Sequence, residues 1–173
     1  MGLKKYKMST KNYYKENAKV KLKEIIENIG FAMMATRLGN KPLHIIPMYT
    51  KKVDPDGNIW FLSKKDSDHF QNIKIDNDVQ LIYSEPKSAK YLSLSGRAST
   101  TEDSEIINDL YSNLDNNWFE GPEDPLITAI CIEPVKAYYW DTKTNKFIDF
   151  MKMEINTYLG TNMDVGEKGK LEI

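Results

Sequence analysis

Short apolar segments separated by tight-turn signals are the feature that most restricts the fold of this chain. Phe31–Arg37 ("FAMMATR") and Leu43–Asp54 ("LHIIPMYTKKVD") are rich in strand-forming residues, and the "LGNKP" between them is typical of a turn. "PDGN" is a second turn signal, and Ile59–Ser63 ("IWFLS") follows it as a third strand. Strands joined by such short turns are neighbours in an antiparallel sheet.

The second half of the chain adds more strands. Asp78–Glu85 and Lys90–Thr100 have strand character, and Leu126–Thr142 predicts a long final strand that Pro134 bends. Pro47 likewise places the second strand at a sheet edge or at a bulge. About six antiparallel strands with few helices predict a mainly β fold, a closed or partly closed barrel with peripheral α-helices. Side chains fill a barrel of this size, so a sizeable ligand must bind outside it.

Three helices are predicted around the barrel. The first has apolar residues at helical spacing from Ala18 to Ile29, and Gly30 follows as a natural C-terminal stop. The second is short and takes part of its apolar face from Phe70. The third spans residues 101–114 ("TEDSEIINDLYSNL"), with acids in its first turn and apolar residues at four-residue steps.

The composition is that of a globular protein without a membrane segment. Hydrophobic residues make up 40% of the chain and charged residues 28%, and no apolar run approaches the length of a membrane span. The N-terminus has no apolar h-region, so we expect a cytoplasmic protein without a membrane partner. Cys131 is the single cysteine, and we expect a buried, inert thiol. Histidine and cysteine do not occur at zinc-ligand spacings, so no metal site is expected.

Lysines are concentrated at the N-terminus. Residues 1–23 hold eight lysines and a single acid, Glu16. A basic arm can bind nucleic acid, but these lysines are scattered among polar residues and accompany no nucleic-acid motif. We therefore expect no nucleic-acid partner, a frayed and solvated arm over residues 1–15, and a single domain over residues 16–173.

The junction "WFLSKKDSDHFQNI" (Trp60–Ile73) combines hydroxyl groups and charge where a strand gives way to a helix. The first N–H groups of a helix lack internal partners and lie at the positive end of its dipole, so they favour anions. Ser63 and Ser67 add hydroxyl donors, Lys64 and Lys65 add positive charge, and His69 adds an imidazole. Two interpretations remain open: the group binds a phosphate, or Asp66 or Ser67 merely caps the helix while the lysines face water.

Two further features could belong to a ligand site. The alternation in "YLSLSGRA" places Tyr91, Ser93 and Ser95 on one sheet face, which is either solvent-exposed or a polar ligand wall. Trp118 lies in the polar loop "DNNWFEGPEDP", where a large aromatic side chain needs a ligand, a partner or its own core to cover it. The alternatives stay open for the hydroxyl-bearing sheet face and for Trp118.

Five segments, in order along the chain, match the pattern of a known family. They are "IPMYTKKVDPDGNIWFLSKKDSDHFQNIKIDNDVQLIYSEP", "YLSLSGRAS", "WFEGPEDP", "AYYWD" and "GEKGKLEI". On these segments the chain resembles the pyridoxamine 5'-phosphate oxidase-like flavin-binding split barrels, and in particular their general stress protein branch. The resemblance implies a six-stranded antiparallel split β-barrel, usually a homodimer, with FMN bound in clefts between the subunits.

The resemblance also implies which residues contact FMN. Leu62 and Ser63 would border the ribityl chain and the phosphate, and Ser67 and His69 would bind the phosphate, with Lys64 adding charge. The remaining cofactor-binding residues would surround the isoalloxazine ring. The backbone of Met48, Tyr49 and Thr50 would run along the edge of the ring, and Tyr91 and Ser93 would face it. Trp118, Phe119 or Trp140 would cover the ring, in part from the partner subunit.

The chain departs from the family at three basic positions. Family members commonly carry Arg before the Pro-Met pair and Arg-Lys after the serine at the helix start. Here these positions are Ile46, Asp68 and His69. Fewer fixed cations and an added carboxylate are expected to weaken the attraction for a dianionic phosphate, unless Lys64, Lys65 and the helix N–H groups compensate.

The resemblance implies an FMN-dependent oxidoreductase that acts on an unknown small-molecule electron donor or acceptor. The flavin would perform the hydride chemistry, and no acid–base pair stands out, so the catalytic residues are unknown. Oxidation of pyridoxamine phosphate itself is not expected, because the chain is short and its C-terminus lacks the basic substrate-binding signature. The alternative is a non-catalytic flavin-binding module for stress response or sensing.

Overall fold

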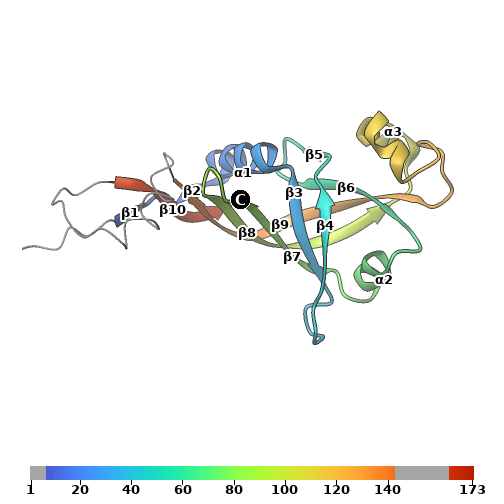
Figure 1. Ribbon diagram of the computed structural model, residues 1–173, viewed down its shortest axis with the longest axis horizontal. Coiled ribbons are helices and arrows are strands. Elements are labelled where there is room, and N and C mark those ends of the chain that lie inside the picture. The colour runs from blue at the N-terminus through green and yellow to red at the C-terminus, as the bar shows by residue number, and fades with distance from the viewer. Residues whose placement is uncertain (1–6, 143–163) are drawn as a thin grey trace, which may run out of the picture.

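The computed structural model describes residues 7–142 and 164–173, and these form one sheet with four helical segments around it (Figure 1). Six antiparallel strands make up the barrel, as predicted. They are β3 (Phe31–Thr36), β4 (His44–Tyr49), β6 (Ile59–Lys64), β7 (Asp78–Glu85), β8 (Lys90–Thr101) and β9 (Ile127–Asp141).

The barrel is split rather than closed. Along one path the strands pair in the order β9-β8-β7-β3-β4, and β6 pairs with the other edge of β9 and with the short β5 (Lys52–Val53). Within the described residues β4 pairs only with β3, so it is an edge strand, as Pro47 predicted. The predicted mainly β, split-barrel fold is confirmed.

The long strand β9 connects the two parts of the sheet. One of its edges pairs with β8, and its other edge pairs with β6 through Ile127–Ile132 and with β10 (Asp164–Glu172) through Ala137–Asp141. The register with β8 shifts between Ser95 and Gly96, opposite Pro134. The predicted bend at this proline is thus a β-bulge.

The N-terminal segment differs from the predicted frayed arm. From Lys7 onward, β1 (Lys7–Thr10) and β2 (Tyr13–Tyr14) pair in parallel with β10, a strand that the sequence analysis did not predict. The Lys11 N–H also donates to the Lys168 carbonyl at 2.9 Å. The expectation of fraying was wrong for residues 7–14, because the C-terminal strand satisfies their backbone groups; residues 1–6 lie outside the described part of the chain.

The helix α1 (Lys15–Ile29) ends as predicted. The backbone of Gly30 has a φ of 78°, a conformation that glycine adopts without strain, and its N–H donates to the Ile26 carbonyl. Lys21, on the buried face of α1, places its ammonium 2.6 Å from Asp141 Oδ2 and 3.8 Å from Glu167 Oε1. Ion pairs therefore fix α1 to the ends of β9 and β10.

The other helical segments are short. They are α2 (Asp68–Ile75), α3 (Ser104–Leu110) and the 3-10 helix η1 (Asn113–Asn117). The third predicted helix was too long, because Tyr111 is extended and Ser112 and Asp115 form a capping box that starts η1. Leu114, predicted on the apolar face of that helix, is 65% exposed. No helix in the described ranges is long and apolar enough to cross a membrane.

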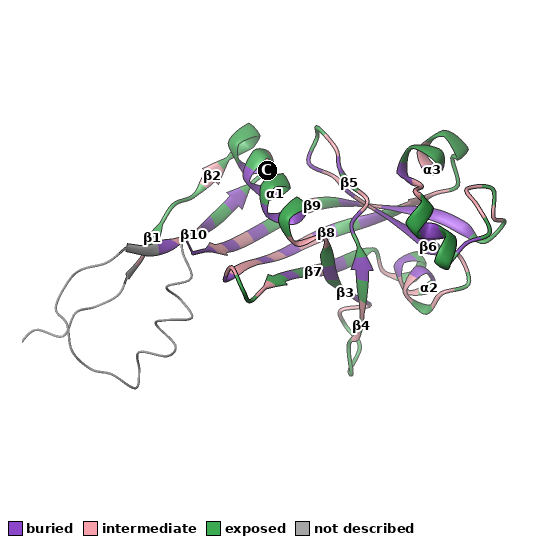
Figure 2. Ribbon diagram, turned by 45° about the horizontal axis from the view of Figure 1, so that its top comes forward, coloured by how far each residue is buried: buried purple, intermediate pink, exposed green. Residues whose placement is uncertain are grey.

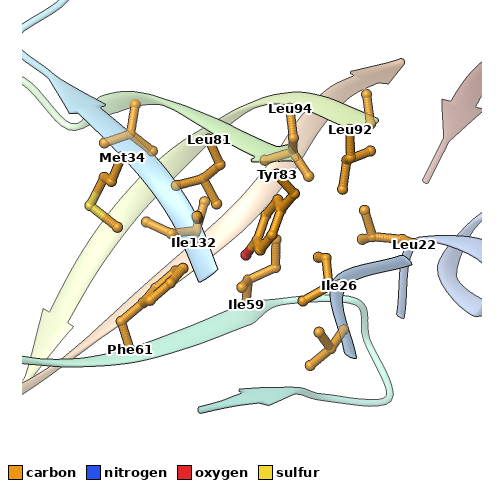
Figure 3. Packing of buried hydrophobic residues seen from close by; sticks show 14 of the residues in the cluster. Leu22, Ile26, Met34, Ile59, Phe61, Leu81, Tyr83, Leu92, Leu94 and Ile132 are labelled. Atoms are coloured by element: carbon orange, nitrogen blue, oxygen red, sulfur yellow. The ribbon is translucent and has the colours of Figure 1, made fainter. Parts of the chain in front are cut away.

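The barrel interior holds the main hydrophobic core (Figure 3). Tyr83 of β7 lies among Leu22 and Ile26 of α1 and Leu92 of β8, and it is fully buried. Its hydroxyl is 2.8 Å from Thr50 Oγ1, so the one polar atom of this ring has a partner. A second, smaller core lies between the other face of β6 and α3, and both elements carry buried positions in Figure 2.

Candidate functional site

The junction between β6 and α2 brings three predicted site residues together. Ser63 lies near the end of β6, opposite Thr128, and its side chain shares the barrel-facing side of the strand with Phe61. Its hydroxyl oxygen is 2.6 Å from His69 Nε2 and 3.3 Å from Ser67 Oγ. The third side of this triangle, Ser67 Oγ to His69 Nε2, is 3.2 Å. We call Ser63, Ser67 and His69 the hydroxyl–imidazole triangle.

Ser67 also caps α2. Its Oγ accepts a hydrogen bond from the Phe70 N–H at 3.4 Å, and its hydroxyl donates to the Lys64 carbonyl at 2.6 Å. The capping interpretation of this serine is therefore confirmed. Capping does not remove it from the triangle, because a hydroxyl oxygen can take part in several hydrogen bonds at once.

Three residues outside the predicted set extend the polar group toward β3 and β4. Asn72 Nδ2 donates to Thr36 Oγ1 at 3.1 Å, and Thr36 Oγ1 lies 3.5 Å from His44 Nδ1. His44 also acts electrostatically on His69. The spacing of His69 and Asn72, three residues apart on a helix, could have indicated Asn72. Nothing in the sequence signals Thr36, which reaches the group through the β3–β4 register.

The imidazole of the triangle is neutral at physiological pH. Burial, aided by His44 and opposed by Asp68, lowers the pKa of His69 to about 4. Neutral imidazole offers one N–H donor and one acceptor nitrogen. The triangle is therefore a cluster of neutral hydrogen-bonding groups rather than a cationic site.

The ammonium groups of the neighbouring lysines contact residues outside the triangle. Lys64 lies on the opposite face of β6 from Ser63, with its ammonium 6.0 Å from the centre of the Phe119 ring. Lys65 forms a 2.9 Å ion pair with Glu102. Ile46, where the family carries arginine, packs against the barrel core. The compensation expected from Lys64 and Lys65 therefore has no support in their positions.

A second group of predicted residues lies on the outer face of the sheet. Cross-strand neighbours in an antiparallel sheet share a face, and Tyr91 is opposite Trp140 while Ser93 is opposite both Tyr138 and Ile82. The Tyr138 and Trp140 rings are 4.7 Å apart between centres. Tyr91, Ser93 and Trp140 thus form one continuous surface.

That surface continues onto β3 and β4 as a largely apolar region. Each of its large side chains exposes between 43% and 59% of its area: Phe31 and Met33 of β3, Ile45 and Tyr49 of β4, and Ile82 of β7. The Phe31 and Tyr49 rings are 5.0 Å apart between centres. We call the region from β4 to β9 the outer sheet face.

The remaining predicted residues lie apart from both groups. The side chains of Met48 and Leu62 belong to the two hydrophobic cores, and the Thr50 hydroxyl is bonded to Tyr83. Trp118, at the end of η1, is 62% exposed, and among the described residues no strand pairing or side-chain hydrogen bond links it to either group. The side chains of Met48 and Thr50 are thus engaged within the protein, and the backbone role that the resemblance implies for them stays a prediction.

Cys131 on β9 is partly rather than fully buried. Burial, with a contribution from Asp54, raises the pKa of its thiol to about 11. The thiol is protonated at neutral pH, and a protonated thiol is a poor nucleophile.

One known protein family matches most of the chain. The sequence profile described as "Pyridoxamine 5'-phosphate oxidase like" matches residues 17–164. The chain belongs to the pyridoxamine 5'-phosphate oxidase-like family. The resemblance found in the five sequence segments is thereby confirmed. No curated protein matches the chain.

Solved structures share the fold of this member of the family. The protein designated general stress protein 26 from Jannaschia sp. CCS1 is 20% identical, with a TM-score of 0.71 over 90% of this chain and 98% of its own. General stress protein 26 from Bacillus anthracis str. Sterne is 26% identical, with a TM-score of 0.63 over 70% and 92%. The general stress FMN/FAD binding protein from Xanthomonas citri is 18% identical, with a TM-score of 0.63 over 84% and 95%.

Proposed function

We propose that this family member binds FMN between two copies of the chain and acts as a flavin-dependent oxidoreductase. The hydroxyl–imidazole triangle would hold the phosphate, and the isoalloxazine ring would lie along β4 and the outer sheet face. The observation that supports this most directly is the convergence of Ser63, Ser67 and His69 within 3.3 Å of one another at a helix start. The name of the Xanthomonas citri relative adds support for a flavin.

The chemistry of the triangle fits a phosphate monoester. Two hydroxyls and one imidazole N–H can donate to phosphate oxygens, next to the N–H groups of the first turn of α2. In the structure these side chains bond to one another and the Ser67 hydroxyl donates to the Lys64 carbonyl, so a phosphate would have to take over these hydrogen bonds. Because His69 is neutral and Lys65 is paired with Glu102, we expect weaker binding than a site with fixed cations would give.

The edge of β4 suits the ring of the cofactor. Within the described residues β4 has a strand partner on one side only, so alternate backbone N–H and C=O groups between His44 and Tyr49 face outward. The pyrimidine part of an isoalloxazine ring carries donors and acceptors that such an edge can pair with. The Thr50 N–H donates to the Gly30 carbonyl at 2.8 Å, so Thr50 and, two residues earlier, Met48 turn their backbone groups toward β3. The outward-facing groups belong to Tyr49, and the edge therefore supports a backbone role for Tyr49 rather than for Met48 or Thr50.

The outer sheet face supports a homodimer. Its exposed residues on β3 and β4 are aromatic or aliphatic, and contiguous apolar surface of this kind marks interaction sites. A second copy would cover this face and, with Tyr91 and Trp140 nearby, would enclose a flat ligand between two sheets. Tyr91, Ser93, Trp118 and Trp140 are proposed to contact the ring from one or the other copy.

The bound flavin would supply hydride transfer with a small-molecule donor or acceptor. The residues of the chain would bind the phosphate, orient the ring and exclude water from it. We assign no acid–base residue, because the imidazole of the triangle is neutral and hydrogen-bonded to Ser63.

The neutral, hydrogen-bonded imidazole of His69 also favours a second candidate function, a flavin-binding module without turnover. A site whose titratable group is buried and already paired can retain a cofactor without taking part in proton transfer. The two candidates differ in one measurable property. An oxidoreductase passes electrons from a nicotinamide nucleotide through its flavin to an acceptor faster than free FMN does, and a storage module does not.

Titration with two flavins tests the proposed site. We expect FMN to bind the purified protein more tightly than riboflavin, because only FMN carries the phosphate. Ser67→Ala combined with His69→Ala should weaken FMN binding by about 1 to 3 kcal/mol, the scale of lost hydrogen bonds to a charged group, and leave riboflavin binding unchanged. Lys74→Ala, on the exposed side of α2, is the control. Equal affinities for FMN and riboflavin in the unmodified protein would exclude a phosphate site at the triangle.

A further inference from the structure

Charge is distributed unevenly along the long axis of the molecule. From Glu102 to Leu126 the sequence has eight acidic residues and no lysine, arginine or histidine. Residues 7–23 have six lysines and one acid. The acidic segment includes α3 and η1 at one end of the molecule, and the basic segment includes β1 and β2 at the other (Figures 1 and 2).

Part of the acidic charge is neutralised within the chain. Glu102, Asp109 and Asp115 form ion pairs with lysines of the barrel. Glu105, Glu120 and Glu123 are exposed and form no ion pair with another described residue. An acidic surface therefore remains at the α3 end.

The opposite end has a matching set of lysines on the outer sheet face. In the register of β9 and β10, Lys168 is opposite Trp140 and Lys170 is opposite Tyr138, so both lysines share the face of these aromatic rings. Neither lysine forms an ion pair with another described residue. Lys136, two residues before Tyr138 on β9, extends the set and is exposed.

The strands β3 and β4, which carry the apolar part of the outer sheet face, lie between the two charged ends along the long axis of the molecule (Figure 1). Two copies that pair across this face by a two-fold axis can do so in two ways. If the axis runs along the molecule, like ends meet; if it runs across the molecule, the acidic end of each copy meets the basic end of the other.

We propose that the two copies pair antiparallel across the outer sheet face, with the acidic surface around Glu120 and Glu123 of each copy against Lys168 and Lys170 of the other. The proposal rests on the dimer of the proposed function and specifies its orientation. Like-charged ends placed together repel, whereas complementary ends attract and select one arrangement. Each composite site would then receive β9 and β10 residues from one copy and the α2 triangle from the other, because α2 lies toward the α3 end (Figure 1).

Charge-reversal variants test this orientation. The dissociation constant of the dimer is measured by analytical ultracentrifugation at low salt for E120K/E123K, for K168E/K170E and for the variant with all four changes. We expect each double variant to weaken the dimer by about tenfold or more, and the fourfold variant to restore it, because reversed charges again face opposite ones. The dimer of the unmodified protein should also weaken with added salt.

Two controls separate orientation from other effects. K74E/K87E changes the net charge as much as K168E/K170E does but alters exposed lysines outside the proposed contact, so it should leave the dissociation constant within about threefold. The neutral variant E120Q/E123Q should weaken the dimer less than E120K/E123K does, and thermal unfolding of every variant verifies its fold.

The outcomes distinguish this inference from the proposed function. A dimer that tolerates both reversals, or whose fourfold variant stays as weak as the double variants, overturns the antiparallel orientation while the dimer stands. A protein that remains monomeric at all concentrations and salt levels overturns the orientation and the dimeric site together. FMN titration of the same samples reports separately whether the cofactor binds.

Discussion

The ammonium of Lys51 lies 2.6 Å from Asp115 Oδ2, and the two side chains are only 6% and 8% exposed. Asp115 also accepts hydrogen bonds from the Ser112 N–H and hydroxyl. This pair joins the segment that follows β4 to η1, two parts of the chain that are 64 residues apart. It therefore fixes the loop that carries Trp118.

Removal of one partner should leave a buried, unpaired charge. We expect Asp115→Ala to lower the free energy of unfolding by about 3 kcal/mol, measured by urea denaturation. Asp109→Ala is the matched control, because Lys52 and Asp109 are equally close at 2.6 Å but exposed. Its effect should stay below about 1 kcal/mol. Equal losses from the two variants would show that burial does not decide the strength of this pair.

The buried contact between Tyr83 and Thr50 gives a second test. Tyr83→Phe removes one hydroxyl and leaves Thr50 Oγ1 without its 2.8 Å partner, so we expect a loss of about 1 to 2 kcal/mol in the free energy of unfolding. Thr50→Val combined with Tyr83→Phe removes both polar groups and should cost no more than Tyr83→Phe alone. A double variant whose loss is the sum of the two single losses would contradict a direct interaction.

Gly169 of β10 should not tolerate a side chain. A Cβ atom there would overlap the carbonyl group of Lys11 and approach Asn12, where the N-terminal segment crosses close to β10. We expect Gly169→Ala to lower the midpoint of thermal unfolding by several degrees, on the scale of about 1 to 3 kcal/mol for overpacking. Gly39→Ala is the control, since a Cβ at Gly39 meets nothing within 4 Å. A midpoint unchanged in both variants would contradict the close approach of the two termini.

His69 should make stability depend on pH. Its pKa is about 4 in the folded protein and near 6.5 in the unfolded chain, so the unfolded chain binds more protons between these values. The stability of the folded protein should therefore fall as the pH decreases from about 6.5 toward 4. Asp68 and His44, the ionisable neighbours of the ring, modify this dependence but do not reverse it.

The measurement compares the unmodified protein with His69→Gln. Between pH 7 and pH 4.5 the unmodified protein should lose about 1 to 2 kcal/mol more than the variant, after solvent screening of the partly exposed ring is allowed for. Carboxylates titrate in both proteins and cancel in the comparison. Parallel pH profiles would show that His69 is not desolvated in the folded protein.

The strands of the barrel could be predicted because their side chains alternate and turn residues separate them. "YLSLSGRA" became the middle of β8, and Pro47 and Pro134 correctly marked an edge strand and a bulge. The end of α1 followed from Gly30, whose backbone conformation favours glycine. These features depend on neighbours in sequence, which is why they are visible without a structure.

Contacts between segments far apart in the sequence account for the strands and side-chain positions that were not predicted. β1, β2 and β10 are polar and lie at the margin of the sheet, so they lack the alternating apolar pattern of a buried strand. The lysines at the β6–α2 junction were grouped with Ser63 by sequence proximity. Strand alternation places Lys64 on the other face, and Glu102, remote in sequence, pairs with Lys65. The assignment of Met48, Tyr49, Tyr91, Ser93, Trp118 and Trp140 to a cofactor stays a prediction.

The position of β9 in the sheet constrains when the strands of the barrel can pair during synthesis. Among the described strands of the barrel, β6 pairs only with residues 127–132 of β9, and β8 pairs with β9 along most of its length. During synthesis, therefore, residues 127–141 must leave the ribosome before β6 and β8 can each pair with β9. Nascent chains that stop short of Ile127 would expose the unpaired edges of β6 and β8, and such edges are sites where incomplete chains associate with one another.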